Sequence, residues 1–126
     1  MTREIKFRAW DEKDGEMLQV HELYLADNSN NFGKGILDEH NDFHPINEIE
    51  LMQFTGLLDK NGKEIFESDV LKIYYEGSQR SYLKKVKWLK DPINKGRWDA
   101  LDNCVFTSCE VVGNIYENPE LAEKIT

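Results

Sequence analysis

Residues 51–70 read LMQFTGLLDKNGKEIFESDV, and they contain the clearest hairpin signal of the chain. Leu51–Thr55 has the composition of a β-strand that ends at Gly56. The following loop contains Asn61-Gly62, the strongest short signal for a β-hairpin, because both central residues of a type I′ turn need positive φ angles. The stretch therefore predicts strands joined by a tight turn, with a further strand beginning at Val70.

The residues before this stretch predict a second hairpin. Residues 5–9, IKFRA, alternate apolar and basic side chains, which is typical of a strand with one buried face. Turn residues ending in Asp14-Gly15 follow, and 17–20 return as a second strand that 23–25 continue. From Asp27 to Asn47 the chain is rich in Asn, Asp, Gly and His with little periodicity, so we expect a long loop there.

Short extended segments also follow residue 70. They cover 70–75, 82–89, 98–101, 104–107 and 110–116. Asn118 is a good N-cap before Pro119, which predicts a brief helix through Lys124. Many short strands with frequent turns and one terminal helix predict a mainly β fold of the barrel type.

Composition limits the class of protein. The 126 residues fit one compact domain. A net charge of −8 disfavours general attraction to nucleic acid or anionic lipid. We find no apolar run long enough to cross a membrane and no signal-peptide pattern at the N-terminus. Two cysteines are too few for a disulfide framework, so we expect reduced thiols and a cytoplasmic location.

Three ordered stretches resemble a known family. Residues 3–11 read REIKFRAWD, 51–70 are quoted above, and 111–121 read VVGNIYENPEL. Their order and spacing are similar to those of the YopX family of small phage and prophage proteins, over essentially the whole chain. The resemblance implies an SH3-like β-barrel with an N-terminal extension. It also implies a phage or prophage context, and it transfers no catalytic residue.

On this basis we predict one YopX-like domain over residues 1–126. Residues 1–50 form its N-terminal hairpin and long loop, and residues 51–126 form the barrel with the terminal helix. The family commonly has glycine where this chain has Ser68. We therefore expect that turn to be made with ordinary backbone dihedrals.

Several small groups of polar residues were weighed as sites. His40 and His44, with Asp38 and Asp42, resemble a small metal-ligand cluster, but their spacing favours a polar surface loop. Cys104 and Cys109 are read as buried, inert thiols.

Two acidic groups were also weighed. The loop 59–62 lacks the ligands of a calcium site. Glu67 and Asp69 share one side of an extended segment, yet nothing nearby in the sequence marks either as a catalytic acid or base. We therefore predict no catalytic, cofactor-binding or metal-binding residues.

The most informative feature is a basic segment. Residues 80–97 hold seven Lys and Arg side chains against Asp91 alone, and aromatic residues lie between them. Basic and aromatic side chains together can bind nucleic acid, but they can equally face solvent or an acidic protein surface. The predicted interaction surface consists of Arg80, Tyr82, Lys84, Lys85, Lys87, Trp88, Lys90, Lys95, Arg97 and Trp98.

The resemblance thus implies a phage- or prophage-encoded accessory protein, which we predict to have no enzymatic activity. Its partner is expected to be another protein or a second copy of itself, with no cofactor and no membrane contact. Two alternatives stay open. One is a nucleic-acid-binding module that uses the basic segment, and the other is a small metal-dependent hydrolase that uses the His40/His44 loop.

Overall fold

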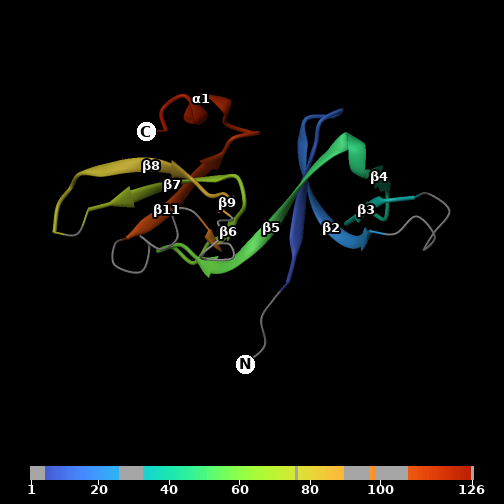
Figure 1. The fold of residues 1–126 in the computed structure, drawn as a ribbon, viewed down its shortest axis with the longest axis horizontal. Coiled ribbons are helices and arrows are strands. Elements are labelled where there is room, and N and C mark those ends of the chain that lie inside the picture. Colours follow the sequence, from blue (N-terminus) through green and yellow to red (C-terminus); the bar gives the residue numbers. More distant parts are fainter. Residues whose placement is uncertain (1–4, 26–32, 76, 90–96, 99–107, 126) are drawn as a thin grey trace. The chain divides into compact units, whose positions relative to one another are not determined.

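The computed structural model describes residues 5–25, 33–75, 77–89, 97–98 and 108–125, without the side chains of Leu89, Arg97 and Trp98. The chain divides into two compact units, Thr2–Gln53 and Phe54–Thr126, which are described separately below (Figure 1). The division falls within one long strand, three residues beyond the 50/51 division expected from the sequence.

The N-terminal unit is an antiparallel sheet. Its strand order is β4-β3-β2-β1-β5, and a single 3₁₀ turn, η1, precedes β5. The elements are β1 (Phe7–Asp11), β2 (Glu16–Tyr24), β3 (Gly35–Asp38), β4 (Phe43–Pro45), η1 (Ile46–Glu48) and the first half of β5 (Ile49–Leu58).

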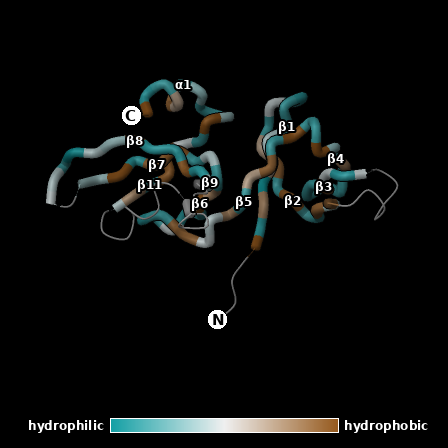
Figure 2. Tube along the Cα trace, viewed as in Figure 1, coloured by the Kyte–Doolittle hydropathy of each residue, from teal (hydrophilic) through white to brown (hydrophobic). Residues whose placement is uncertain are grey.

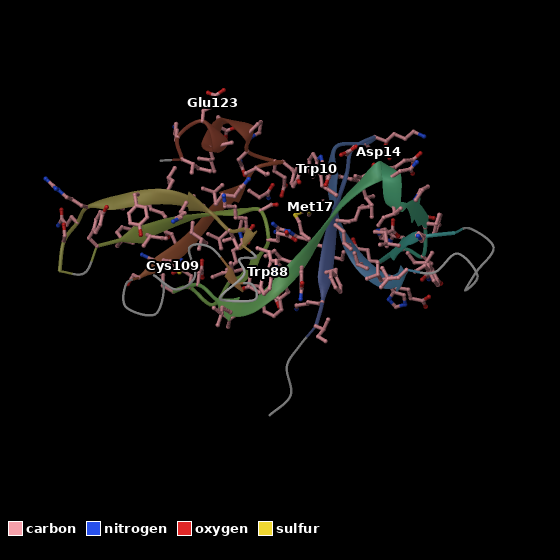
Figure 3. The ribbon with its side chains drawn as sticks, in the orientation of Figure 1. Trp10, Asp14, Met17, Trp88, Cys109 and Glu123 are labelled. Atoms are coloured by element: carbon pink, nitrogen blue, oxygen red, sulfur yellow. The ribbon has the colours of Figure 1, made fainter. Side chains whose placement is uncertain are left out.

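The hairpin of β1 and β2 confirms the predicted alternation. Trp10 pairs with Met17 across the hairpin (Figure 3). Side chains on one face are removed from water and form a small core, because successive residues of a strand point to opposite faces. This core consists of Ala9, Leu18, Ile36 and Ile49, with Val20, Leu23 and Leu51 packed against it.

The long loop expected from Asp27 to Asn47 is wrong for its second half. Residues 35–45 form the hairpin of β3 and β4, with Gly35 opposite Pro45 and Leu37 opposite Phe43. The first part of that loop, 27–32, lies outside the described residues. The two strands have only four and three residues, too few to show a clear alternation of apolar and polar side chains. Polar turn residues between them made the segment look like a loop.

The C-terminal unit consists of short antiparallel pairs. The end of β5 pairs with β6, β9 pairs with β10, and three strands form a sheet in the order β11-β7-β8. These elements are β6 (Glu64–Phe66), β7 (Asp69–Tyr74), β8 (Ser81–Lys85), β9 (Trp88–Leu89), β10 (Arg97–Trp98), β11 (Cys109–Asn114) and α1 (Pro119–Ala122).

The core of this unit lies on one face of β7. It consists of Ile65, Leu71, Ile73, Val86 and Cys109, with Tyr82 and Val111 packed against it. In Figure 2 hydrophobic residues mark β7, whereas hydrophilic residues mark β8. Cys109 is buried, as predicted, and Cys104 lies outside the described residues.

The architecture confirms a mainly β fold. No closed barrel is found within the parts of the chain that the structure describes, so the SH3-like closure stays a prediction. The sequence predicted that strand β5 ends at Gly56, and that prediction is wrong. The strand continues to Leu58 through an irregularity in its pairing with β6, and Gly56 takes a φ of +89° there.

The turn from Asp59 to Lys63 is a hairpin turn, but it is not type I′. Gly62 has a φ of +83°, while Asn61 is not among the residues with positive φ. The amide of Gly62 donates to the carbonyl of Asp59 at 3.0 Å, and the amide of Asp59 donates to the carbonyl of Lys63 at 2.8 Å. This is a three-residue loop closed by a left-handed glycine, the next most common hairpin connection.

The expectation for Ser68 is wrong. Ser68 adopts a φ of +73°, in the left-handed region. Its amide donates to the carbonyl of Val86 at 2.8 Å, and its carbonyl accepts from the amide of Ile115 at 3.2 Å. The surrounding segments therefore hold a serine in a conformation that glycine adopts without steric cost.

Replacing Ser68 by glycine is expected to stabilise the protein. Removing the Cβ strain outweighs the added freedom of the unfolded chain, for a net gain of about 0.5–1 kcal/mol. The midpoint of urea unfolding should rise. Ser81→Gly, in the extended strand β8, is the matched control and should lower the midpoint instead. A midpoint of Ser68→Gly at or below that of the wild type would contradict the positive φ of Ser68.

The terminal helix is shorter than predicted. Helix α1 covers Pro119–Ala122 rather than reaching Lys124. Asn118 occupies the N-cap position, but its side chain makes no capping hydrogen bond to the helix. Its Oδ1 instead accepts from the amide of Asn114 at 3.2 Å, which fastens the helix to the end of β11.

Candidate interaction surface

Strand β8 carries the first part of the predicted interaction surface. Tyr82, Lys84 and Lys85 lie on β8, Arg80 directly precedes it, and the exposed Lys87 and Trp88 follow it. The backbone of Arg97 and Trp98 pairs with Leu89 and Trp88 in the β9–β10 ribbon. Lys90 and Lys95 lie outside the described residues, so the structure locates only part of the set.

The β7–β8 register divides this basic segment between two faces. Tyr82 is paired with Ile73 and Lys84 with Leu71, so both share the face that carries the core. Lys85 is paired with Val70 and points to the opposite face. Strand geometry thus separates neighbouring lysines that look like one stripe in the sequence.

The core-bearing face extends into an aromatic pair at the β7–β8 turn. The rings of Tyr75 and Tyr82 lie 5.1 Å apart, and Tyr75 is 51% exposed. The amide of Tyr75 donates to the carbonyl of Arg80 at 3.0 Å, so Arg80 closes this end of the hairpin. Arg80, Tyr82 and Lys84 therefore follow one another along a single face of β8.

The opposite face gathers two cations that the sequence analysis missed. The Nζ of Lys60 lies 4.5 Å from the centre of the Tyr74 ring, and the Nζ of Lys72 lies 5.4 Å from it. Lys85 shares this face with Lys72, because Lys85 is paired with Val70, which lies two residues before Lys72 in β7.

An acidic residue balances this second group. The hydroxyl of Tyr74 donates to Glu110 at 2.9 Å. Alternation along the predicted strand at 70–75 could have placed Lys72 and Tyr74 together. Lys60 comes from the distant hairpin turn, and no local pattern reveals its position.

Asp59 explains how that turn is held. Its Oδ1 accepts from the amides of Asn61 and Lys63 at 2.8 and 2.9 Å, and its Oδ2 accepts from the amide of Val111 at 2.9 Å. Burial acts to raise the pKa of Asp59, but these amides and the nearby charge of Lys63 outweigh it and hold the pKa below its usual value. This carboxylate therefore has a structural role in the turn.

The histidine group at 40 and 44 does not converge on a shared centre. The side chain of His40 is 78% exposed, and its Nε2 lies 3.7 Å from Glu39. The Nε2 of His44 is 2.8 Å from Asp38 Oδ2, and its Nδ1 lies 3.8 Å from Asp11 Oδ2. Each ring nitrogen of His44 thus faces a buried carboxylate of its own chain.

The carboxylate of Asp38 also accepts hydrogen bonds from the main chain of its own hairpin. Its Oδ1 accepts from the amides of His40 and Asp42 at 2.8 and 3.1 Å. Burial acts to raise the pKa of Asp38, but the hydrogen bonds from His44, Asp42 and His40 together hold it below the usual value. Asp38 and its hydrogen-bond partners thus stabilise the β3–β4 hairpin.

The Glu67/Asp69 pair also has a structural explanation. Asp69 is 1% exposed, and its Oδ2 accepts from the amide of Phe66 at 2.7 Å. A buried carboxylate that closes the β6–β7 turn in this way is committed to the fold.

Acidic side chains crowd the end of the β1–β2 hairpin. Carboxylate oxygens of Asp11, Asp14 and Glu16 lie within 4.8 Å of one another, and Asp14 marks this end in Figure 3. Nearby, a side-chain hydrogen bond with Glu12, partial burial and the charge of Glu12 raise the pKa of Glu50. This end of the N-terminal unit therefore carries closely spaced like charges.

The fold and this surface define a small mainly β protein with an acidic N-terminal unit and a basic strand edge in its C-terminal unit. The family model described as YopX protein matches residues 6–123, and the chain belongs to that family.

Two solved structures are similar. Protein EF1440 from Enterococcus faecalis is 28% identical with a TM-score of 0.68, and the match covers 95% of this chain and 99% of that one. Protein yopX from Bacillus subtilis is 22% identical with a TM-score of 0.54, and the match covers 92% and 96%. Comparison with the curated proteins gives no match. No helix among the described residues is long and apolar enough to span a membrane.

Proposed function

We propose that this YopX-family chain is a non-enzymatic protein-binding module that associates with itself. Its basic segment, residues 80–97, binds the acidic N-terminal unit of a second copy. We further infer a phage- or prophage-encoded accessory protein acting in the cytoplasm of a bacterial host, as the family resemblance implies.

The division of charge between the units is the observation that carries this proposal. Residues 2–53 hold five basic and twelve acidic side chains, a net charge of −7. Residues 54–126 hold eleven basic and twelve acidic side chains, a net charge of −1. Within the latter, residues 80–97 alone carry +6. One chain thus offers both partners of a charge-complementary contact.

Local crowding at the acidic unit supports the same pairing. A hydrogen bond with Glu12, partial burial and the negative charge of Glu12 raise the pKa of Glu50. The two carboxyl groups therefore lie close enough to repel each other when both are ionised. A lysine or arginine from a second copy would relieve that repulsion. Salt would weaken such a contact, because exposed charges are screened over about 10 Å at 0.1 M ionic strength.

The nucleic-acid alternative uses the same cations differently. A single strand needs a continuous basic and aromatic track. Here Lys84 and Lys85 lie on opposite faces of β8, and the whole chain carries −8. Repulsion of a polyanion by that net charge favours an acidic protein surface as the partner.

The hydrolase alternative finds less support in the geometry. A histidine acting as a metal ligand or general base needs a ring nitrogen directed at the metal or the substrate. Both nitrogens of His44 face Asp38 and Asp11, and His40 lies on the exposed side of its turn.

Reversing two lysines tests the proposal. The double variant Lys85→Glu, Lys87→Glu should keep the fold, because Lys87 is exposed and Lys85 is partly exposed on the face opposite the core. Surface changes of this kind usually alter stability by less than about 0.5 kcal/mol. Light scattering should show the wild type heavier than the 14.8 kDa chain and the variant at the monomer mass. The melting temperature checks that the variant remains folded.

A control variant distinguishes the effect of where the lysines lie from the effect of the change in net charge. Lys34→Glu with Lys124→Glu changes the net charge equally, and both lysines are exposed outside the basic segment. This variant should associate as the wild type does. Equal loss of association in both variants would contradict a defined contact. Micromolar binding of single-stranded DNA at physiological salt, lost only in the Lys85/Lys87 variant, would favour the nucleic-acid function.

A further inference from the structure

We infer that the outer edge of β8 takes up an extended acidic segment of a partner protein as an additional β-strand. The inference rests on the proposed protein-binding function and uses part of the same basic segment. It adds the mode of binding and a second kind of partner besides another copy of the chain.

Strand β8 is the last strand of its sheet in the described part of the chain. It pairs with β7 over five consecutive residues, from Ser81 to Lys85, without a register shift. The order β11-β7-β8 leaves its other side without a paired strand among the described residues. A regular strand at a sheet edge is a template for another strand.

The register shows which backbone groups face outward. The amide of Tyr75 donates to Arg80 at one end of the hairpin, and the amide of Val86 donates to Asp69 at the other. Hydrogen-bonded pairs alternate along an antiparallel ladder, so Tyr82 and Lys84 exchange bonds with β7. The amides and carbonyls of Ser81, Leu83 and Lys85 consequently point to the outer edge.

Two of the features that block a sheet edge, proline and bulges, are absent from this strand. Residues 81–85 contain no proline and no bulge. Their lysines do hinder pairing with the same edge of a second copy, because like charges would then lie opposite each other. An acidic strand at the same edge would instead place carboxylates opposite these lysines, where opposite charges attract.

Charge complementarity specifies the partner. Lys84 and Lys85 project from opposite faces of β8, and Arg80 and Lys87 flank it. Glutamate or aspartate on either face of an added strand would therefore lie beside a cation. The partner is an extended segment rich in Asp and Glu, and strand addition of this kind derives its affinity from main-chain hydrogen bonds.

Residue-specific hydrogen exchange tests this inference. The probe is a synthetic eight-residue peptide of alternating glutamate and valine, added to dilute full-length protein and followed by NMR. The peptide should slow exchange of the Ser81, Leu83 and Lys85 amides at least tenfold. The Tyr82 and Lys84 amides, already bonded to β7, should change little. A peptide with lysine in place of glutamate is the control and should have no effect.

Three other outcomes would overturn the inference. Peptide binding without this alternating protection would mean that side-chain charge alone is recognised. Slow exchange at Ser81, Leu83 and Lys85 in the dilute protein would mean that the chain itself fills the edge. Protection that grows with protein concentration before peptide is added would assign the edge to a second copy. Failure of self-association with alternating protection by the peptide would reject the proposed function alone.

Discussion

Replacing Gly35 by alanine should destabilise the N-terminal unit by about 3 kcal/mol, at the upper end of overpacking effects. Gly35 is buried opposite Pro45 at the start of the β3–β4 hairpin. A Cβ at this position would overlap the main-chain carbonyl of His44 and approach the Phe43 ring to 2.7 Å. The main chain of β4 would have to move, and β4 holds the histidine between Asp38 and Asp11.

Chemical denaturation followed by circular dichroism measures this effect. Gly15→Ala is the matched control, because Gly15 has a φ of +69° and open space around its Cβ direction. That change should cost only about 1 kcal/mol, through backbone strain. If Gly35→Ala is no more destabilising than Gly15→Ala, the close β3–β4 contact is wrong.

Asp59→Ala is expected to cost about 3 kcal/mol at neutral pH, since it leaves three partly buried amide donors without their charged acceptor. The carboxylate accepts three amides and connects the turn at 59–63 to β11 through Val111. Its loss would also release Lys60 from its place over the Tyr74 ring.

The same variant has a defined pH dependence. The pKa of Asp59 is lowered in the folded protein, so its contribution is present above the unfolded pKa, near 4, and is lost as the pH falls through the folded value. The difference in unfolding free energy between wild type and Asp59→Ala should therefore shrink between pH 7 and pH 3. Urea unfolding at both pH values measures it. A difference that stays constant would show that the ionised carboxylate is not what stabilises the turn.

Strands with a clear alternation could be predicted from the sequence. The β1–β2 hairpin follows from residues 5–20, because one buried face imposes a period of two. The β3–β4 hairpin could not be predicted in this way. Its strands are short, and the Asp38–His44 contact that ties them together depends on side chains six residues apart meeting across the turn.

Backbone conformation at single residues was also beyond local rules. Serine at position 68 suggested ordinary dihedrals, yet bonds to Val86 and Ile115, from distant parts of the chain, hold it at positive φ. Tertiary contacts override local preference there.

The interaction surface was predicted in composition but not in arrangement. Sequence alone identifies the basic segment, since seven cations accumulate around one aspartate. The division of Lys84 and Lys85 between faces needs the β7–β8 register. The place of Lys60 beside Tyr74 depends on the hydrogen bonds that join the 59–63 turn to β11.

The mass of the wild-type protein in solution, measured by sedimentation at low and high salt, tests the self-association claim most directly. Charge-complementary association predicts a species heavier than 14.8 kDa at low salt that returns to the monomer as salt screens the contact. A mass of 14.8 kDa at every salt and protein concentration, or an oligomer indifferent to salt, would contradict the claim.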